Sequence, residues 1–465
     1  MTRIKDYRGI RPERGEIETI AAWMLERARE MSGPALLGAD IVYFFSESHN
    51  LSLRDGEPEE NGYGSSNGVG IRTIARDGRQ GVAYGNNLAR TRLEEIVAWS
   101  CSNCLSAEPE ENISLYRGPM EADDSLLEQY DENIAAGVDA RETLRICREM
   151  TAAAKRRDRR VESVRAAYWS NGLGESFYAS TEGLAGWRRA TSAACGVTVV
   201  LSGGDSFEMG SYGNYERFLA DLDPLRYAEA AVDRTGRLLG GRPLETGKYA
   251  LVLEPEVAAS LVDEIGELFC ASDVHKGRSL MKGKLGAEVA GGVVTLTDDA
   301  RLPRRAGSAA FDGEGVPTGR TVLIGTGMAN AYLYNLQYAA KDGVRSTGSA
   351  SRGLSSLPDV GTSNLVLAPG AATPEELVKG IGKGLLVQEL MGLHTLNPVS
   401  GDFSLGAKGL RIKNGRIDGP VAGVTIAGNL LDFLGKITAL GDDLEFFGST
   451  GAPTIVVEDV TVAGN

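Results

Sequence analysis

The chain has 465 residues, and 42% of them are hydrophobic while 24% are charged, which is the balance of a globular protein rather than a disordered or fibrous one. The 63 acidic residues outnumber the 49 Lys and Arg residues, so the formal net charge is −14. An overall charge of this sign opposes binding to nucleic acid. At this length we expect two or three domains.

The first residues lack the apolar core of a signal peptide, and no stretch approaches the ~18 uninterrupted apolar residues of a membrane span. The five cysteines are odd in number and scattered, which is typical of reduced thiols. Cys101 and Cys104 fall on the apolar face of a predicted helix, without a second Cys or His pair that would complete a metal site. We therefore expect a cytoplasmic protein that binds no membrane and no nucleic acid.

The first half of the chain predicts helices and antiparallel strands. Apolar residues at helical spacing predict a helix over residues 16–31. Alternating apolar residues between Asp-Gly and Asn-Gly turns predict an antiparallel meander. Its expected strands are residues 40–48, 51–54, 68–75 and 81–84. Helices are expected over residues 91–106 and about 122–155, followed by strands over residues 161–168, 175–180, 186–201 and 206–212. The two strand-rich stretches are alike in their hairpins, which does not by itself establish a repeat.

Gly240, Gly241 and Pro243 indicate a domain boundary. We predict an N-terminal α/β region over residues 1–235 and a β-rich C-terminal domain over residues 245–465, together an α+β fold. The second region is expected to open with a strand over residues 249–253 and a helix over residues 255–270, which Pro255 begins. Short strands and glycine turns follow, with helices near residues 374–379 and 429–437.

Several short motifs resemble catalytic ones but lack their companions. Ser279 and Lys282 match a Ser-x-x-Lys pattern, without the other motifs of the acyl-transfer enzymes that use it. Gly325 and Gly327 follow a strand but lack the further glycine or lysine of a nucleotide-binding loop, which favours a tight turn. The three histidines, His49, His275 and His394, are far apart in sequence and form no local zinc motif.

A long motif in the C-terminal region carries a family resemblance. Leu396-Asn-Pro-Val-Ser-Gly-Asp-Phe-Ser-Leu-Gly-Ala407, followed by Lys413-Asn-Gly415 and Pro420-Val421, resembles the signature of the TldD/PmbA family, also called the modulator of DNA gyrase family. Ser346-Thr-Gly348 and Arg352 support the likeness, which covers about residues 16–463. The family implies an α/β N-terminal region followed by a β-rich domain.

The resemblance also implies a function. TldD-type subunits carry a His-Glu-x-x-x-His helix that binds zinc, whereas PmbA or TldE-type subunits lack it and pair with them to process peptides. In this chain Asp263 and Leu268 stand at the two His positions and Glu264 at the Glu position. Leucine cannot ligate zinc, and the glutamate needs a metal-bound water to act on. The chain therefore most resembles the PmbA/TldE branch, with no catalytic residue and no cofactor of its own.

The resulting hypothesis is a non-zinc subunit of a cytoplasmic heteromeric metallopeptidase, whose partner is a TldD-type subunit that holds the zinc and whose substrates are extended peptides. Candidates for lining the peptide groove are Asn397, Ser400, Asp402 and Ser404. The alternative is that these residues only build a turn through bonds to its backbone. Two other functions stay open: a stand-alone binding or adaptor protein, and an independent hydrolase that uses Ser279 and Lys282 or a dispersed histidine site. The chain alone could also form a homodimer.

Overall fold

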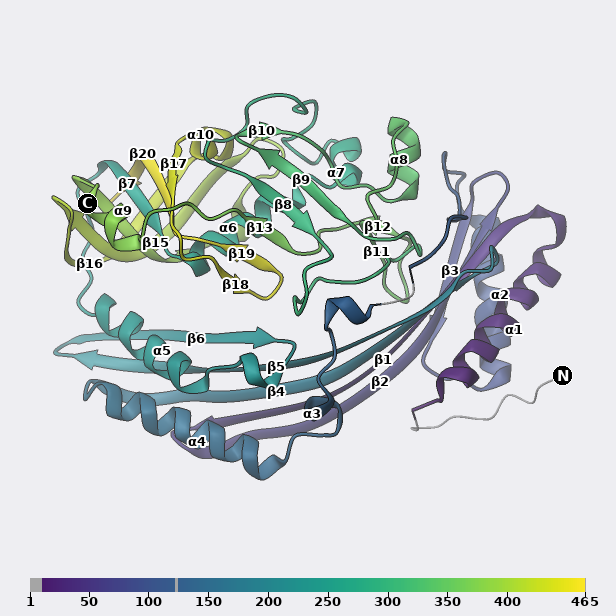
Figure 1. Ribbon diagram of the computed structural model, residues 1–465, viewed down its shortest axis with the longest axis horizontal. Helices are drawn as coiled ribbons and strands as arrows, with labels where there is room; N and C mark the ends of the chain where they lie inside the picture. Colours follow the sequence, from purple (N-terminus) through teal and green to yellow (C-terminus); the bar gives the residue numbers. More distant parts are fainter. Residues whose placement is uncertain (1–10, 122–123, 465) are drawn as a thin grey trace.

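The computed structural model describes residues 11–121 and 124–464 (Figure 1). The N-terminal half is built on one long, curved, antiparallel sheet in the order β3-β2-β1-β4-β5-β6. Its strands are β1 (Leu36–Arg54), β2 (Glu57–Ala75), β3 (Gln80–Gly85), β4 (Val161–Ser180), β5 (Ala185–Gly203) and β6 (Ser206–Glu216). β1 and β4 lie at the centre and pair from Asp40↔Ser180 to Leu53↔Ala167.

Two pairs of helices cover the convex face of this sheet. They are α1 (Arg14–Ser32) with α2 (Arg90–Ser106), and α4 (Ala140–Arg157) with α5 (Pro224–Leu238). Successive side chains of a strand point to opposite faces, so the odd-numbered residues of β1 share the face toward the helices. Ile41 and Tyr43 pack with α1 and α2, and Leu53 packs with α4 and α5. The opposite, concave face is turned toward the C-terminal half (Figure 1).

The same succession of elements occurs twice in the N-terminal half. A helix, a three-stranded meander and a second helix form α1-β1-β2-β3-α2, and the same order returns in α4-β4-β5-β6-α5. The two meanders join at the antiparallel β1–β4 pair. The likeness of the two strand-rich stretches therefore extends beyond hairpins to the order of whole elements.

The C-terminal half contains two further six-stranded sheets, ordered β16-β15-β14-β7-β20-β17 and β10-β9-β8-β13-β19-β18. The first comprises β7 (Gly247–Leu253), β14 (Lys383–Met391), β15 (Asp402–Lys413), β16 (Arg416–Asn429), β17 (Ile437–Leu440) and β20 (Ile455–Ala463). The second comprises β8 (Leu296–Asp299), β9 (Arg320–Gly325), β10 (Met328–Ala329), β13 (Leu365–Leu367), β18 (Glu445–Phe447) and β19 (Thr450–Ala452). The expected α+β fold, with a β-rich second half, is confirmed.

Short elements complete this half: β11 (Ala350–Ser351), β12 (Asp359–Val360), α7 (Ala271–Lys276), α8 (Leu336–Asp342), α9 (Pro374–Lys379) and α10 (Leu430–Gly435). Helix α6 (Pro255–Glu267) packs against strands of both six-stranded sheets, and the buried side chains around it form one continuous core. No helix among the residues described is both long enough and apolar enough to span a bilayer.

One predicted helix is partly wrong. The helix expected over residues 122–155 forms only from Ala140 onward as α4. Before it lie a 3₁₀ turn (Ser125–Leu127) and the single turn α3 (Glu132–Ala135). Gly137 adopts a φ of 92°, which interrupts a right-handed helix, and the Asp139 side chain accepts a hydrogen bond from the Arg141 amide to begin α4. Residues 122–123 lie outside the described part of the chain.

Strands that were predicted as separate segments are continuous. His49 and Asn50, between the expected strands 40–48 and 51–54, pair with both β2 and β4, so β1 runs unbroken. Gly172 and Gly174 likewise join the two expected parts of β4. Pairing on both sides thus overrides the low strand propensity of asparagine and glycine.

Candidate functional site

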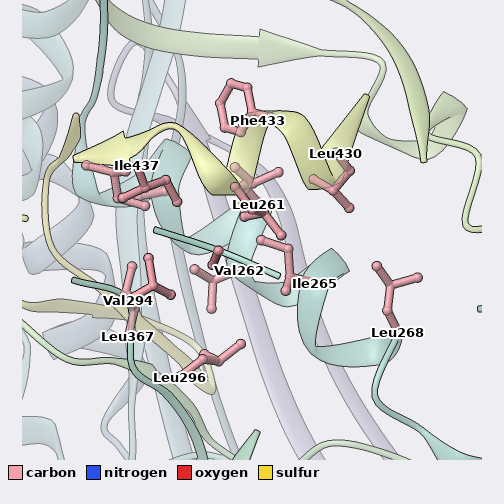
Figure 2. Packing of buried hydrophobic residues seen from close by; sticks show 14 of the residues in the cluster. Leu261, Val262, Ile265, Leu268, Val294, Leu296, Leu367, Leu430, Phe433 and Ile437 are labelled. Carbon is pink, nitrogen blue, oxygen red and sulfur yellow. The ribbon is translucent and has the colours of Figure 1, made fainter. Parts of the chain in front are cut away.

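Helix α6 presents two chemically different faces. Val257, Leu261 and Ile265 are buried in the C-terminal core. Figure 2 shows Leu261, Val262, Ile265 and Leu268 gathered with side chains from other elements, including Leu430 and Phe433. The other face carries Glu256, Ser260, Asp263, Glu264 and Glu267. This helical spacing leaves a polar stripe outside the core.

The family resemblance singled out Asp263 and Glu264 on this helix and Leu268 directly after its last residue. Leu268 is 4% exposed and belongs to the core. Asp263 is exposed, and its carboxylate accepts a hydrogen bond of 3.0 Å from the Thr450 hydroxyl. Glu264 is half-buried; burial and the neighbouring Asp263 raise its pKa, while the nearby His394 opposes that shift. An aliphatic side chain at one position and a hydroxyl-bonded carboxylate at the other do not fit a zinc ion that needs two imidazoles.

A groove lies beside the N-terminal part of α6, between the two halves of the molecule. We call it the interdomain groove; its volume is about 360 Å³. It is lined by Thr198, Met209, Gly210, Ser211, Arg234, Thr235, Leu238, Glu256, Val257, Ser260, Gln388, Glu389, Leu390, Met391 and Leu393. These residues come from β5, β6, α5, α6, β14 and the turn after β14.

Arg234 organises the polar wall of the interdomain groove. Its guanidinium lies 2.7 Å from the Glu256 carboxylate and 3.2 Å from that of Glu254. It also donates a hydrogen bond of 3.2 Å to the Gln388 carbonyl. Burial raises the pKa of Glu256, and the positive charge of Arg234 opposes this shift. The ion pair thus fixes the start of α6 against α5 and β14.

Gln388 supplies an unused hydrogen-bond acceptor. The side chain is 3% exposed, and its amide nitrogen donates to Glu254 at 2.9 Å. Its Oε1 has no hydrogen-bond partner among the residues described. A buried acceptor without a partner is costly, so a donor from a bound molecule would stabilise it.

β14 also has an edge that is free on one side. Its parallel pairing with β7 stops at Val387, where the Glu254 amide donates to the Val387 carbonyl at 3.2 Å and α6 begins. Among the residues described, Glu389, Leu390 and Met391 pair with β15 and with no second strand. The main chain along the groove therefore lacks a strand neighbour on the side of α6.

The four residues predicted to line a peptide groove are exposed and follow the interdomain groove in sequence. Asn397 and Ser400 lie in a turn, and Asp402 and Ser404 lie at the start of β15. The Asn397 side chain accepts hydrogen bonds from the Val399 and Ser400 amides at 2.9 and 3.1 Å. The Asn429 side chain donates hydrogen bonds to the Ser400 carbonyl and to the Asp402 carboxylate. Hydrogen bonds from the side chains of Ser400, the stronger influence, and of Asn429 lower the pKa of Asp402. Ser404 is exposed on β15. None of the four lines the interdomain groove.

The other sequence candidates occupy separate places. The Ser279 hydroxyl donates to the Leu268 carbonyl at 2.5 Å and accepts from the Met281 amide at 3.0 Å. Gly325 and Gly327 form the tight turn between β9 and β10, as predicted. His275 pairs with Asp342 at 2.8 Å. Across residues 11–121 and 124–464, no cluster of three or more His, Cys, Asp or Glu side chains is arranged to hold a metal ion.

The groove residues were missed because Arg234, Glu256 and Gln388 come from three distant segments. One signal was present: Glu256, Ser260, Glu264 and Glu267 recur every three or four residues on the polar face of a helix that the sequence did predict.

Comparison with known proteins places these features in a family. Models of the first, central and C-terminal domains of PmbA/TldA metallopeptidases match residues 39–104, 134–239 and 246–464. The chain is 25% identical over 438 residues to the metalloprotease PmbA of Escherichia coli O157:H7, covering 94% of each chain.

Two solved structures share the fold. One, named as a modulator of DNA gyrase from Bacteroides thetaiotaomicron VPI-5482, has a TM-score of 0.86 at 25% identity and covers 97% of this chain and 99% of its own. The other, TldE from Thermococcus kodakarensis, has a TM-score of 0.85 at 21% identity and covers 96% and 100%.

Proposed function

The chain belongs to the TldD/PmbA metallopeptidase family, and from this premise we propose that it is a TldE/PmbA-type subunit that holds no catalytic zinc. Its role is to complete a cytoplasmic peptidase with a TldD-type partner, which contributes the zinc. The observation that carries the proposal is the buried Leu268 at a motif position where zinc binding would need an imidazole. Glu264 then has no metal-bound water to activate.

The interdomain groove is the part of this subunit that receives the peptide. An extended peptide can add to a free strand edge through main-chain hydrogen bonds, and Glu389–Met391 offer such an edge. The unpartnered Oε1 of Gln388 is an acceptor suited to a peptide N–H. Asn397, Ser400, Asp402 and Ser404 are then candidates for the continuation of the peptide path beyond Leu393.

An independent hydrolase built on Ser279 has less support. Its hydroxyl proton is committed to the Leu268 carbonyl, and Ser279 is 4% exposed. A nucleophilic serine needs a neighbouring base to take that proton and an open path to the substrate. Co-elution with a TldD-type partner distinguishes a peptidase subunit from a stand-alone adaptor.

Zinc analysis of the purified chain tests the proposal. After dialysis against a mild chelator, we expect far less than one zinc per chain from the protein alone and about one zinc per heteromer when a TldD-type partner is co-purified. Peptide cleavage should appear only in the mixture. Tightly held zinc in the chain alone would contradict the proposal, and failure to co-elute with such a partner would favour the adaptor.

A further inference from the structure

A second cavity lies on the convex, helix-bearing face of the N-terminal sheet, away from the interdomain groove. It sits over strands β1, β2 and β4, beside α3 and the residues that follow it, and its volume is about 340 Å³. We call it the convex-face cavity. Its lining residues are Glu47, Ser48, His49, Tyr63, Gly64, Ser65, Ile134, Ala135, Gly137, Val138, Asn171, Gly172 and Leu173. Strands carry its floor, so the cavity is preformed on a rigid element.

His49 provides a buried acceptor in this cavity. The side chain is 4% exposed, and its Nε2 lies 2.9 Å from the Asn61 Oδ1. A bond to the Asn61 carbonyl oxygen uses the proton on Nε2, and in the neutral ring Nδ1 is then an acceptor. Nδ1 has no hydrogen-bond partner among the residues described. The cavity therefore contains a hydrogen-bond acceptor to which no described residue donates.

The charge of the convex-face cavity is negative. Glu47 lies on the same strand face as His49, two residues away, and takes part in no ion pair within the described structure. No Lys or Arg is among the lining residues. An anion would meet the carboxylate with no compensating cation, whereas a cation would find an acceptor and a counter-charge together.

The remaining walls fit a molecule with an alkyl portion. Ile134, Val138 and Leu173 line the cavity with apolar surface, which suits the methylene stem of an amphipathic cation. The Tyr63 ring stacks on His49 with centroids 4.2 Å apart and an interplanar angle of 7°, yet Tyr63 is 69% exposed. An accessible aromatic ring beside a carboxylate favours guanidinium and ammonium groups.

We propose that the convex-face cavity binds an alkyl cation, either the side chain of an arginine or lysine from another protein or a free alkylguanidine or alkylamine. The Glu47 carboxylate receives the charge, His49 Nδ1 accepts one N–H bond, and the apolar wall receives the stem. Nothing in this assignment depends on the proposed peptidase role, because the cavity lies on the opposite face of the sheet from the C-terminal half.

The chain has three histidines, so nuclear magnetic resonance of histidine-labelled protein reports on His49 with little overlap. Titration with butylguanidinium should shift the His49 imidazole nitrogen signals saturably, while His275 and His394 stay unchanged. The uncharged analogue butylurea should cause no saturable shift. Equal responses to both probes, or no response to butylguanidinium, would overturn the proposal.

Three variants locate the interaction. Glu47 is exposed, so Glu47→Gln should weaken butylguanidinium binding about threefold or more. Ser65→Lys should abolish binding, because Ser65 lies opposite Glu47 on β2 and a lysine there would neutralise the carboxylate. Glu60→Gln, an exposed carboxylate on the same hairpin, is the matched control and should bind as the parent does. Retained affinity in Glu47→Gln, with the melting temperature unchanged, would refute the assignment.

A last pair of probes separates the two sources of the cation. Acetyl-Gly-Arg-Gly-amide presents the side chain within a peptide, and butylguanidinium presents it free. Binding of both indicates a site open to a protein side chain, and binding of butylguanidinium alone indicates a small-molecule site. Failure of both overturns the proposal.

Discussion

The Asp40 carboxylate, on the first strand of the N-terminal sheet, forms a fully buried ion pair with the Arg352 guanidinium from the C-terminal half. Arg72, on the neighbouring strand, binds the same carboxylate and is 2% exposed. One acidic group therefore joins the concave face of the N-terminal sheet to the C-terminal half. Burial alone would raise the pKa of Asp40, but Arg352 and Arg72 together hold it below its ordinary value of 3.8.

Replacing Asp40 with Asn should be strongly destabilising. It leaves the buried Arg352 guanidinium without the carboxylate it pairs with, and it leaves Arg72 with the more distant Glu314 carboxylate at 3.7 Å. Breaking a buried pair in this way costs about 3–5 kcal/mol. Chemical denaturation should show this loss in the free energy of unfolding. Asp77→Asn, which breaks an exposed pair with Arg79, is the matched control and should change stability little. An equal, small effect of both would mean that Asp40 does not join the two halves.

Stability should also fall as the pH rises from about 4.5 to about 7. Burial raises the pKa of Glu314 from 4.5 to about 7 and that of Asp312 from 3.8 to about 6. A carboxyl whose pKa is raised on folding contributes stability below its unfolded pKa and loses it as the pH rises through the folded value. Glu314→Gln should therefore flatten the decline between about pH 4.5 and 7 in thermal melts. An unchanged slope would contradict this assignment.

The lowered pKa of Asp40 acts in the opposite direction at acid pH. Its contribution is present above pH 3.8 and is lost as the pH falls through the lower folded value. The contribution of Asp40 and the contributions of Glu314 and Asp312 therefore change with pH in opposite directions.

Blocking the interdomain groove should impair peptide processing without unfolding the chain. Ser260 is exposed on α6 within the groove, so Ser260→Trp fills the space that a peptide would enter. We expect at least a tenfold loss of cleavage by the mixed complex and a nearly constant melting temperature. Ser102→Trp, on the exposed face of α2, is the control. Full activity of Ser260→Trp would show that the peptide does not pass through the interdomain groove.

The turn at Asn397–Ser404 allows a separate test of the sequence prediction. Asp402→Ala should reduce cleavage more than it lowers the melting temperature if the segment contacts peptide. The competing interpretation follows from the hydrogen bond between Asn429 and Asp402, whose loss would loosen the turn. A clear drop in melting temperature with retained activity would assign the segment a structural role only.

The sequence predicted those elements whose periodicity is strong and local. The helices at residues 16–31 and 255–270 follow from apolar residues at helical spacing, and they match α1 and α6 closely. The unbroken β1 could not be predicted, because His49 and Asn50 favour a strand only when β2 and β4 pair with them. The interdomain groove was likewise beyond reach, since β14, α5 and α6 meet only through the tertiary fold.

The three positions of the zinc-binding motif were predicted from the family resemblance and not from periodicity. The resemblance pointed to Asp263, Glu264 and Leu268 on chemical grounds. The buried packing of Leu268 adds that an imidazole there would place a polar ring among apolar core side chains. The burial of Leu268 thus supports, on physical grounds, the hypothesis that this chain holds no zinc at the motif, which periodicity alone could not do.

Paired glutamate variants in the assembled complex test the central claim most directly. Glu264→Gln in this chain should leave the rate of peptide cleavage nearly unchanged, whereas the matching Glu→Gln change in a TldD-type partner should lower it by about 100-fold or more, since only there would a carboxylate take a proton from zinc-bound water. Co-elution must first show that both variants assemble. A large loss of rate from Glu264→Gln alone, with assembly intact, would show that this subunit contributes a catalytic carboxylate and would contradict the account.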